Sequence, residues 1–111
     1  MLRRFGFVLN SRLTLEQAVK HQNLLVIDVR TPEEVAMTGK VPSAINIPID
    51  TLASSTSSLG QDKMRPILFY CAKGIRSAHA VEMAIKSGYT NAYSTIDARS
   101  ALQLLHGTLV N

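Results

Sequence analysis

The stretch LLVIDVRTPEEVAMTG, residues 24–39, predicts a buried strand that is followed directly by a helix. Residues 24–29 are almost continuously apolar, which is typical of a strand buried on both faces of a parallel sheet. Thr31 can cap the helix, the proline after it suits the first helical position, and Glu34 completes a capping box. Gly39 indicates where this helix ends.

On both sides of this stretch, apolar runs alternate with helical patterns. Further strands are expected at residues 44–49, 66–70 and 91–95. Further helices are expected at residues 14–23, after a cap at Asp50, at residues 76–88 and at residues 97–107. The serine-rich segment after the Asp50 helix is interpreted as a loop. This alternation predicts a single α/β domain over residues 1–111, built on a parallel sheet.

Charge and composition argue against two classes of partner. The net charge is +4, but the first twelve residues contribute Arg3, Arg4 and Arg12 without any acid, and aromatic residues make up only 5% of the chain. A nucleic-acid-binding face would need basic residues spread over a surface and interleaved with aromatics. No apolar run is long enough to span a bilayer. We therefore expect neither nucleic acid nor a membrane as a partner.

The basic start of the chain, MLRRFGFVLNSR, allows two interpretations. It is rich in arginine and lacks acids, as in an organelle transit peptide, but the apolar residues 5–9 favour a first strand. We expect a cytoplasmic protein, and targeting to an organelle stays open. One cysteine and three distant histidines, His21, His79 and His106, do not have the spacing of metal ligands, so no metal site is expected.

The only cysteine of the chain, Cys71, follows the strand at residues 66–70 and precedes a helix. Ligands of parallel sheets bind beyond the carboxyl ends of the strands, and inward-pointing amides together with a helix dipole stabilise an anion there. Lys73 and Arg76 should lower the pKa of the thiol, and Gly74 allows tight curvature. The alternative is a buried cysteine that acts as a small apolar residue.

The helix after this loop has two faces. We expect the apolar face to be buried and the polar face to be solvated, so that His79 is not the base that activates Cys71. The residues on the apolar face are Ala78, Val81, Ala84 and Ile85, and those on the polar face are His79, Glu82 and Lys86.

The loop CAKGIR resembles the active-site loop of single-domain rhodaneses, which are thiosulfate sulfurtransferases. The stretch VIDVRTPEEVAMTGKVPSAINIP, residues 26–48, resembles the first hallmark of that family, and RSAHAVEMAIKSGYTNAYST, residues 76–95, resembles its helix and last strand. The resemblance covers residues 24–95 in order. It implies a rhodanese-like three-layer α/β fold, in which a mostly parallel central sheet has helices on both faces.

The resemblance also implies a two-step reaction. Cys71 would attack the outer sulfur of thiosulfate, release sulfite and hold a persulfide, and a thiophilic acceptor such as cyanide, a cellular thiol or an acceptor protein would remove the sulfur. Lys73 and Arg76 would anchor the sulfonate end of the donor. No metal or organic cofactor is implied. The persulfide would lie in a cradle of backbone amides from Ala72, Lys73, Gly74, Ile75 and Arg76.

Two further charged residues, Asp28 and Arg30, lie at the end of a strand and are expected to support the site as a buried scaffold that joins Arg30 to Glu34. The chain departs from the family after its last strand. Many members have a Gly-Gly pair and a later tryptophan, where this chain has TIDARSALQLL and no tryptophan. The wall of the cleft near Asp97 and Arg99 is therefore expected to differ, which affects the choice of substrate.

Two alternative functions stay open. Phosphatases and arsenate reductases of related folds also place a cysteine and an arginine around an oxyanion, but the phosphatase loops have one more residue between them. The shorter loop from Cys71 to Arg76 favours sulfur. The second alternative is a rhodanese-like module that binds a partner or carries sulfur passively, although inactive members commonly lack the cysteine.

Overall fold

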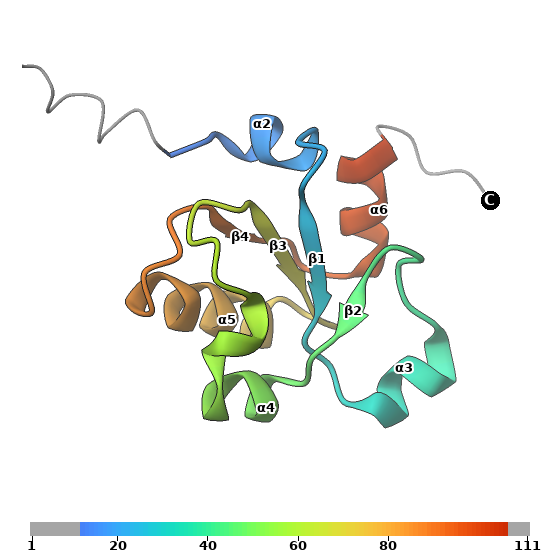
Figure 1. Cartoon of the computed structure of the whole chain (residues 1–111). Coiled ribbons are helices and arrows are strands. Elements are labelled where there is room, and N and C mark those ends of the chain that lie inside the picture. The colour runs from blue at the N-terminus through green and yellow to red at the C-terminus, as the bar shows by residue number, and fades with distance from the viewer. Residues whose placement is uncertain (1–11, 107–111) are drawn as a thin grey trace, which may run out of the picture.

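The computed structural model describes residues 12–106 as a parallel sheet with helices around it (Figure 1). The transit-peptide and strand interpretations of residues 1–11 fall outside the described range. The strands are β1 (Leu25–Asp28), β2 (Ile45–Asn46), β3 (Ile67–Tyr70) and β4 (Ala92–Ser94). The helices are α2 (Leu15–Val19), α3 (Pro32–Thr38), α4 (Ile49–Ser54), α5 (Ile75–Lys86) and α6 (Ala98–His106), with a short 3₁₀ helix, η2 (Thr56–Leu59).

The four strands are all parallel and lie in the order β2-β1-β3-β4. Helices α4 and α5 cover one face of the sheet, and α2 and α6 cover the other (Figure 1). The three-layer α/β fold expected from the sequence is confirmed. Within residues 12–106, no helix is both long and apolar enough to cross a membrane.

Side chains of the central strand β3 alternate between the two faces of the sheet. Ile67 and Phe69 pack with the core beneath α4 and α5, whereas Leu68 and Tyr70 pack with the core beneath α2 and α6. Because the period of a strand is two residues, the next residue, Cys71, faces the α5 side. It lies in the α5-side core cluster, at the carboxyl end of the sheet.

The capping boxes are confirmed at both places where the sequence contains them. Thr14 accepts from the Gln17 amide and the Gln17 side chain accepts from the Thr14 amide, while Thr31 and Glu34 make the same reciprocal pair. These local contacts fix the starts of α2 and α3. Helix α2 nevertheless ends at Val19, earlier than expected.

Three local expectations differ from the structure. The strand expected at residues 44–49 is a regular strand only at Ile45–Asn46. Beyond it, the amides of Ile47 and Ile49 still donate to the carbonyl oxygens of β1 and of the residue after it, so the chain stays beside β1 without regular strand pairing. Asp50 lies inside the first turn of α4 and is not its cap. The serine-rich segment forms η2, whose Leu59 is buried in the core.

The buried face of α5 is also shifted from the expected one. Ala78 and Ile85 are exposed, and Val81 is half-buried. The buried side chains are those of Ser77, Ala80 and Ala84. The helix thus turns a small polar residue, Ser77, toward the end of the sheet where Cys71 lies.

Candidate active site

The segment between β3 and α5 forms a tight loop around the sulfur of Cys71. Gly74 has φ +94°, a conformation that side chains rarely tolerate. A Cβ added to Gly74 would lie 3.5 Å from the Cα of Ile96, so the loop also passes close to the chain that follows β4. A glycine is therefore favoured here by the backbone turn, whereas the contact with Ile96 would leave room for a Cβ.

The Cys71 sulfur is surrounded by hydrogen-bond donors. The Gly74 amide donates to it at 3.0 Å and the Ser77 amide at 3.4 Å, and the Ser77 hydroxyl lies 3.6 Å away. The carbonyl oxygen of Ile96 lies 3.9 Å from the sulfur. Cys71 is only 2% exposed, so the sulfur is enclosed at the bottom of the loop.

These donors change the acidity of the Cys71 thiol. Burial by itself raises the pKa of Cys71, because it disfavours the charged form. Hydrogen bonds from the Ser77 hydroxyl and from the amides of Ser77, Lys73 and Gly74 outweigh this effect, so that the pKa of Cys71 is lowered from its usual value. The loop therefore favours the thiolate, which is the nucleophilic form of cysteine.

Ser77 is a residue of the site that the sequence analysis did not single out. Its side chain is fully buried, and its hydroxyl lies 3.0 Å from the Thr95 carbonyl oxygen and 3.2 Å from that of Gly74. A hydroxyl has one hydrogen to donate. Ser77 can donate to a carbonyl while Cys71 is protonated, and to the sulfur once Cys71 is a thiolate. Its place in the first turn of the helix after the loop was the available signal.

We predict that Ser77→Ala makes the thiol of Cys71 less acidic. Loss of the hydroxyl removes a hydrogen bond to the thiolate, so alkylation by iodoacetamide at pH 7 should slow about three- to tenfold. The midpoint of the alkylation rate against pH should move upward, toward that of an unperturbed thiol. Ser43→Ala, at an exposed position, is the control. Equal pH midpoints in both variants would contradict this role for Ser77.

The guanidinium of Arg76 is held by a carboxylate. Its two terminal nitrogens donate to the two oxygens of Glu34 at 2.6 and 2.9 Å. The hydrogen bond from Arg76 is the main reason that the pKa of Glu34 is lowered to about 2, and the same pair raises the pKa of Arg76. Lys73, Ala72 and Ile75 are exposed on the loop. Arg76 therefore reaches the site as half of a neutral pair.

Asp28 and Arg30 form a buried scaffold in which Arg30 pairs with Asp28 and not with Glu34. The Arg30 Nε donates to both Asp28 oxygens at 3.0 and 3.1 Å, and Nη2 donates to Oδ2 at 2.6 Å. The expected pair of Arg30 with Glu34 is wrong, because residues two apart in an extended segment share a face, which brings Arg30 to Asp28. Arg30 also donates to Thr38 and to the Gly39 carbonyl, so the pair ties the end of α3 to β1.

This scaffold lies on the side of the sheet away from Cys71. The guanidinium carbon of Arg30 stands 5.8 Å from the centre of the Tyr70 ring, which belongs to the core beneath α2 and α6. The Tyr70 hydroxyl accepts from the Val41 amide at 2.9 Å, and burial raises the pKa of Tyr70 to about 12. Asp28, Arg30 and Tyr70 therefore support the ends of β1 and β3 without touching the sulfur of Cys71.

The remaining candidates lie outside the loop. His79 is exposed on α5 and faces Glu82 at 3.9 Å. Asp97 caps α6 by accepting from the Ser100 amide at 2.9 Å. In the part of the chain that the structure describes, no group of three or more His, Cys, Asp or Glu side chains could hold a metal ion.

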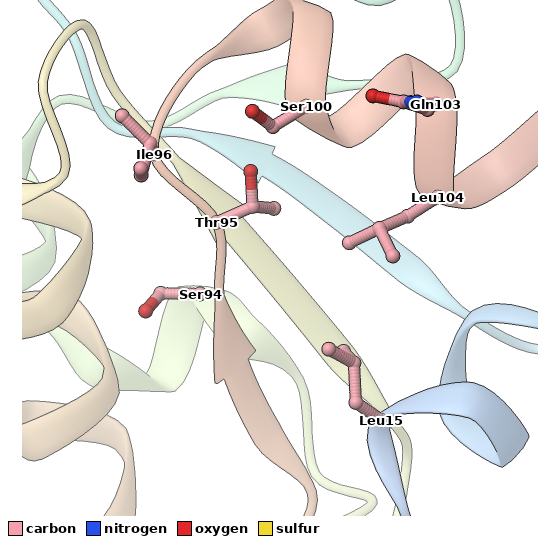
Figure 2. A pocket seen from close by; sticks show the side chains of 7 residues that line it. All are labelled: Leu15, Ser94, Thr95, Ile96, Ser100, Gln103 and Leu104. Atoms are coloured by element: carbon pink, nitrogen blue, oxygen red, sulfur yellow. The ribbon is translucent and has the colours of Figure 1, made fainter.

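A cavity of about 570 Å³ lies beside β4, between α2 and α6 (Figure 2). Cys71 does not line it, although two of its lining residues, Thr95 and Ile96, present their carbonyl oxygens to the cysteine loop. The lining residues are Leu15, Ser94, Thr95, Ile96, Ser100, Gln103 and Leu104. This cavity is therefore distinct from the enclosed sulfur.

Comparison with known proteins identifies related chains. A family model, the rhodanese-like domain, matches residues 11–103. A rhodanese domain-containing protein of Drosophila melanogaster is 35% identical over 82 residues, which are 64% of this chain and 74% of that protein. The mitochondrial thiosulfate sulfurtransferase RDL2 of Saccharomyces cerevisiae is 35% identical over 89 residues, 66% of this chain but only 57% of the yeast protein. A solved structure of a rhodanese with anions from E. coli superposes with a TM-score of 0.59 at 30% identity, covering 68% of this chain and 87% of that one.

Proposed function

The chain belongs to the rhodanese-like domain family, and from this premise we propose that it is a sulfurtransferase that carries sulfane sulfur as a persulfide on Cys71. The observation that supports this most directly is the set of donors around the sulfur, with amides of Gly74 and Ser77 at 3.0 and 3.4 Å. Such donors stabilise a negative charge both on the thiolate and on the terminal sulfur of a persulfide.

In the first step, the Cys71 thiolate attacks the outer sulfur of thiosulfate. The new S–S bond forms as the bond between the two sulfurs of the donor breaks, and sulfite leaves with that electron pair. The charges balance, because a thiolate and a dianion give a persulfide anion and a sulfite dianion. The lowered pKa of Cys71 raises the fraction of thiolate available at neutral pH. Lys73, exposed on the loop, would attract the sulfonate end of the donor.

In the second step, an acceptor removes the outer sulfur. Cyanide would leave as thiocyanate, and a thiolate would leave as a new persulfide, each time returning the Cys71 thiolate. Ser77 and the loop amides would stabilise the regenerated Cys71 thiolate as they stabilise it before the first step. A small thiol or a cysteine on an acceptor protein are the proposed cellular acceptors.

The test is the intact mass of the purified protein after incubation with thiosulfate in the absence of reductant. We expect the mass to increase by one sulfur atom, located on the peptide that contains Cys71, and to return to its starting value when cyanide is added. Rapid hydrolysis of an aryl phosphate without any gain of sulfur would instead favour the phosphatase alternative. A thiol that takes up no sulfur and alkylates slowly at neutral pH would favour the binding module.

A further inference from the structure

The side chains around Cys71 carry little net positive charge to attract a dianionic donor. Glu34 engages both terminal nitrogens of Arg76, so these two residues together add no net charge. Within the loop of residues 71–76, Lys73 supplies the cation that Glu34 does not neutralise. A thiosulfate dianion that approaches the Cys71 thiolate therefore meets one uncompensated positive side chain together with the loop amides.

Apolar side chains are exposed next to the same loop. Ile75, which begins α5, is 70% exposed, and Ile96 is 58% exposed. Ile96 lies against Gly74, so both isoleucines flank the backbone that encloses the sulfur. An exposed apolar surface beside a reactive group can contact an organic substituent, whereas a sulfonate oxygen gains nothing from it.

We infer that this site prefers sulfur donors that carry a single negative charge and an organic substituent, the thiosulfonates R–SO₂–S⁻, over thiosulfate, and that Glu34 sets this preference by neutralising Arg76. This inference rests on the proposed function. The transfer is balanced: the Cys71 thiolate takes the outer sulfur, the sulfur–sulfur bond of the donor breaks, and a sulfinate R–SO₂⁻ leaves with the electron pair. No oxidant or reductant is needed.

Glu34 acts on the charge of the donor and does not touch the reacting sulfur. The pKa of Glu34 is lowered to about 2, mainly by Arg76, so its charge is constant over the pH range in which Cys71 titrates. Its carboxylate also accepts from the Thr31 amide in the capping box, which fixes its position. Glutamine at this position can complete the same box and still accept from Arg76, so Glu34→Gln removes the charge with little change of shape.

The experiment compares kcat/KM for sodium thiosulfate and sodium benzenethiosulfonate, with cyanide as acceptor, in Glu34→Gln and Glu33→Gln. Glu33 is exposed in the same helical turn and is the charge-matched control. The ratio of thiosulfate to benzenethiosulfonate kcat/KM should rise about three- to tenfold in Glu34→Gln relative to the control. Without the Glu34 charge, Arg76 is no longer neutralised, and it attracts a dianion more strongly than a monoanion. In the wild type, benzenethiosulfonate should exceed thiosulfate by a larger factor than it does in reaction with a small thiolate in solution, because a sulfinate is by itself a better leaving group than sulfite.

A second variant tests the inference if Glu34→Gln does not fold, which its thermal unfolding would show. Lys73→Gln removes the uncompensated cation and should move the same ratio in the opposite direction, relative to Lys86→Gln at the far end of α5. Persulfide formation from both donors with ratios that stay within twofold of the controls would overturn this inference and leave the proposed function intact. No persulfide from either donor on the wild type would overturn both.

Discussion

Cys71→Ser is expected to lower the transfer of sulfur from thiosulfate to cyanide by at least about a thousandfold, because an alcohol is not ionised at neutral pH and cannot carry sulfane sulfur. The fold should survive the change. The serine oxygen would occupy the same buried position and could accept from the Gly74 and Ser77 amides that now contact the sulfur. The measurement is the rate of thiocyanate formation, together with thermal unfolding to show that the variant is folded.

The control for Cys71→Ser uses the wild-type protein itself. Cys71 is the only cysteine in the chain, so complete alkylation with iodoacetamide blocks this one thiol. Alkylated wild type and Cys71→Ser should show the same residual rate. A folded Cys71→Ser protein that keeps more than a tenth of the activity would mean that sulfur transfer does not pass through this residue.

Local signals in the sequence were sufficient for the fold. The stretch at residues 24–39 contains an apolar strand, a capping box and a terminal glycine, and each is set by contacts within a few residues. The loop was also predictable, because Cys71 follows an apolar run and Gly74 precedes a helix. The short β2 was harder to predict, since its length depends on how it pairs with β1.

The partners of the charged residues could not be predicted in the same way. Glu34 has a local role as the capping residue of α3, and nothing in its surroundings along the chain indicates that it also holds Arg76, which is 42 residues away. That contact exists because β1 and β3 are neighbours in the sheet, which brings α3 and the start of α5 to the same end. The pair of Asp28 and Arg30 is different, since the two-residue period of an extended segment is a local signal for it, although we expected Arg30 to pair with Glu34.

The role of Ser77 depends both on its local position in the sequence and on a contact with a distant segment. The sequence places it in the first turn of a helix after a cysteine loop, but its contact with the Thr95 carbonyl joins that helix to the segment after β4. The same segment presents the Ile96 carbonyl to the sulfur. Two segments distant along the chain therefore determine the environment of Cys71. The loop with the start of α5 is recognisable from its own residues, whereas the segment after β4 is not.

Asp28→Ala is expected to have the largest effect on stability. Asp28 is fully buried and accepts from the Arg30 amide as well as from its guanidinium, so the variant leaves a buried cation without its counter-ion. Removing one partner of a buried ion pair costs about 3–5 kcal/mol of unfolding free energy. For a domain of this size that corresponds to a fall in Tm of roughly 12–25 °C. The measurement is urea unfolding followed by circular dichroism, with thermal unfolding beside it.

Two further variants separate the loss of charge from other effects of replacing Asp28. Asp28→Asn keeps an oxygen that can accept from Arg30 but removes the charge, so its unfolding free energy should lie between those of the wild type and Asp28→Ala. Asp62→Ala, at an exposed aspartate whose carboxylate accepts only from the nearby Met64 amide among the described residues, should lose less than about 1 kcal/mol. Because the pair lies away from the sulfur, folded Asp28→Asn should keep the wild-type pH midpoint of Cys71 alkylation. A shifted midpoint at unchanged stability would instead mean that this scaffold acts on the thiol.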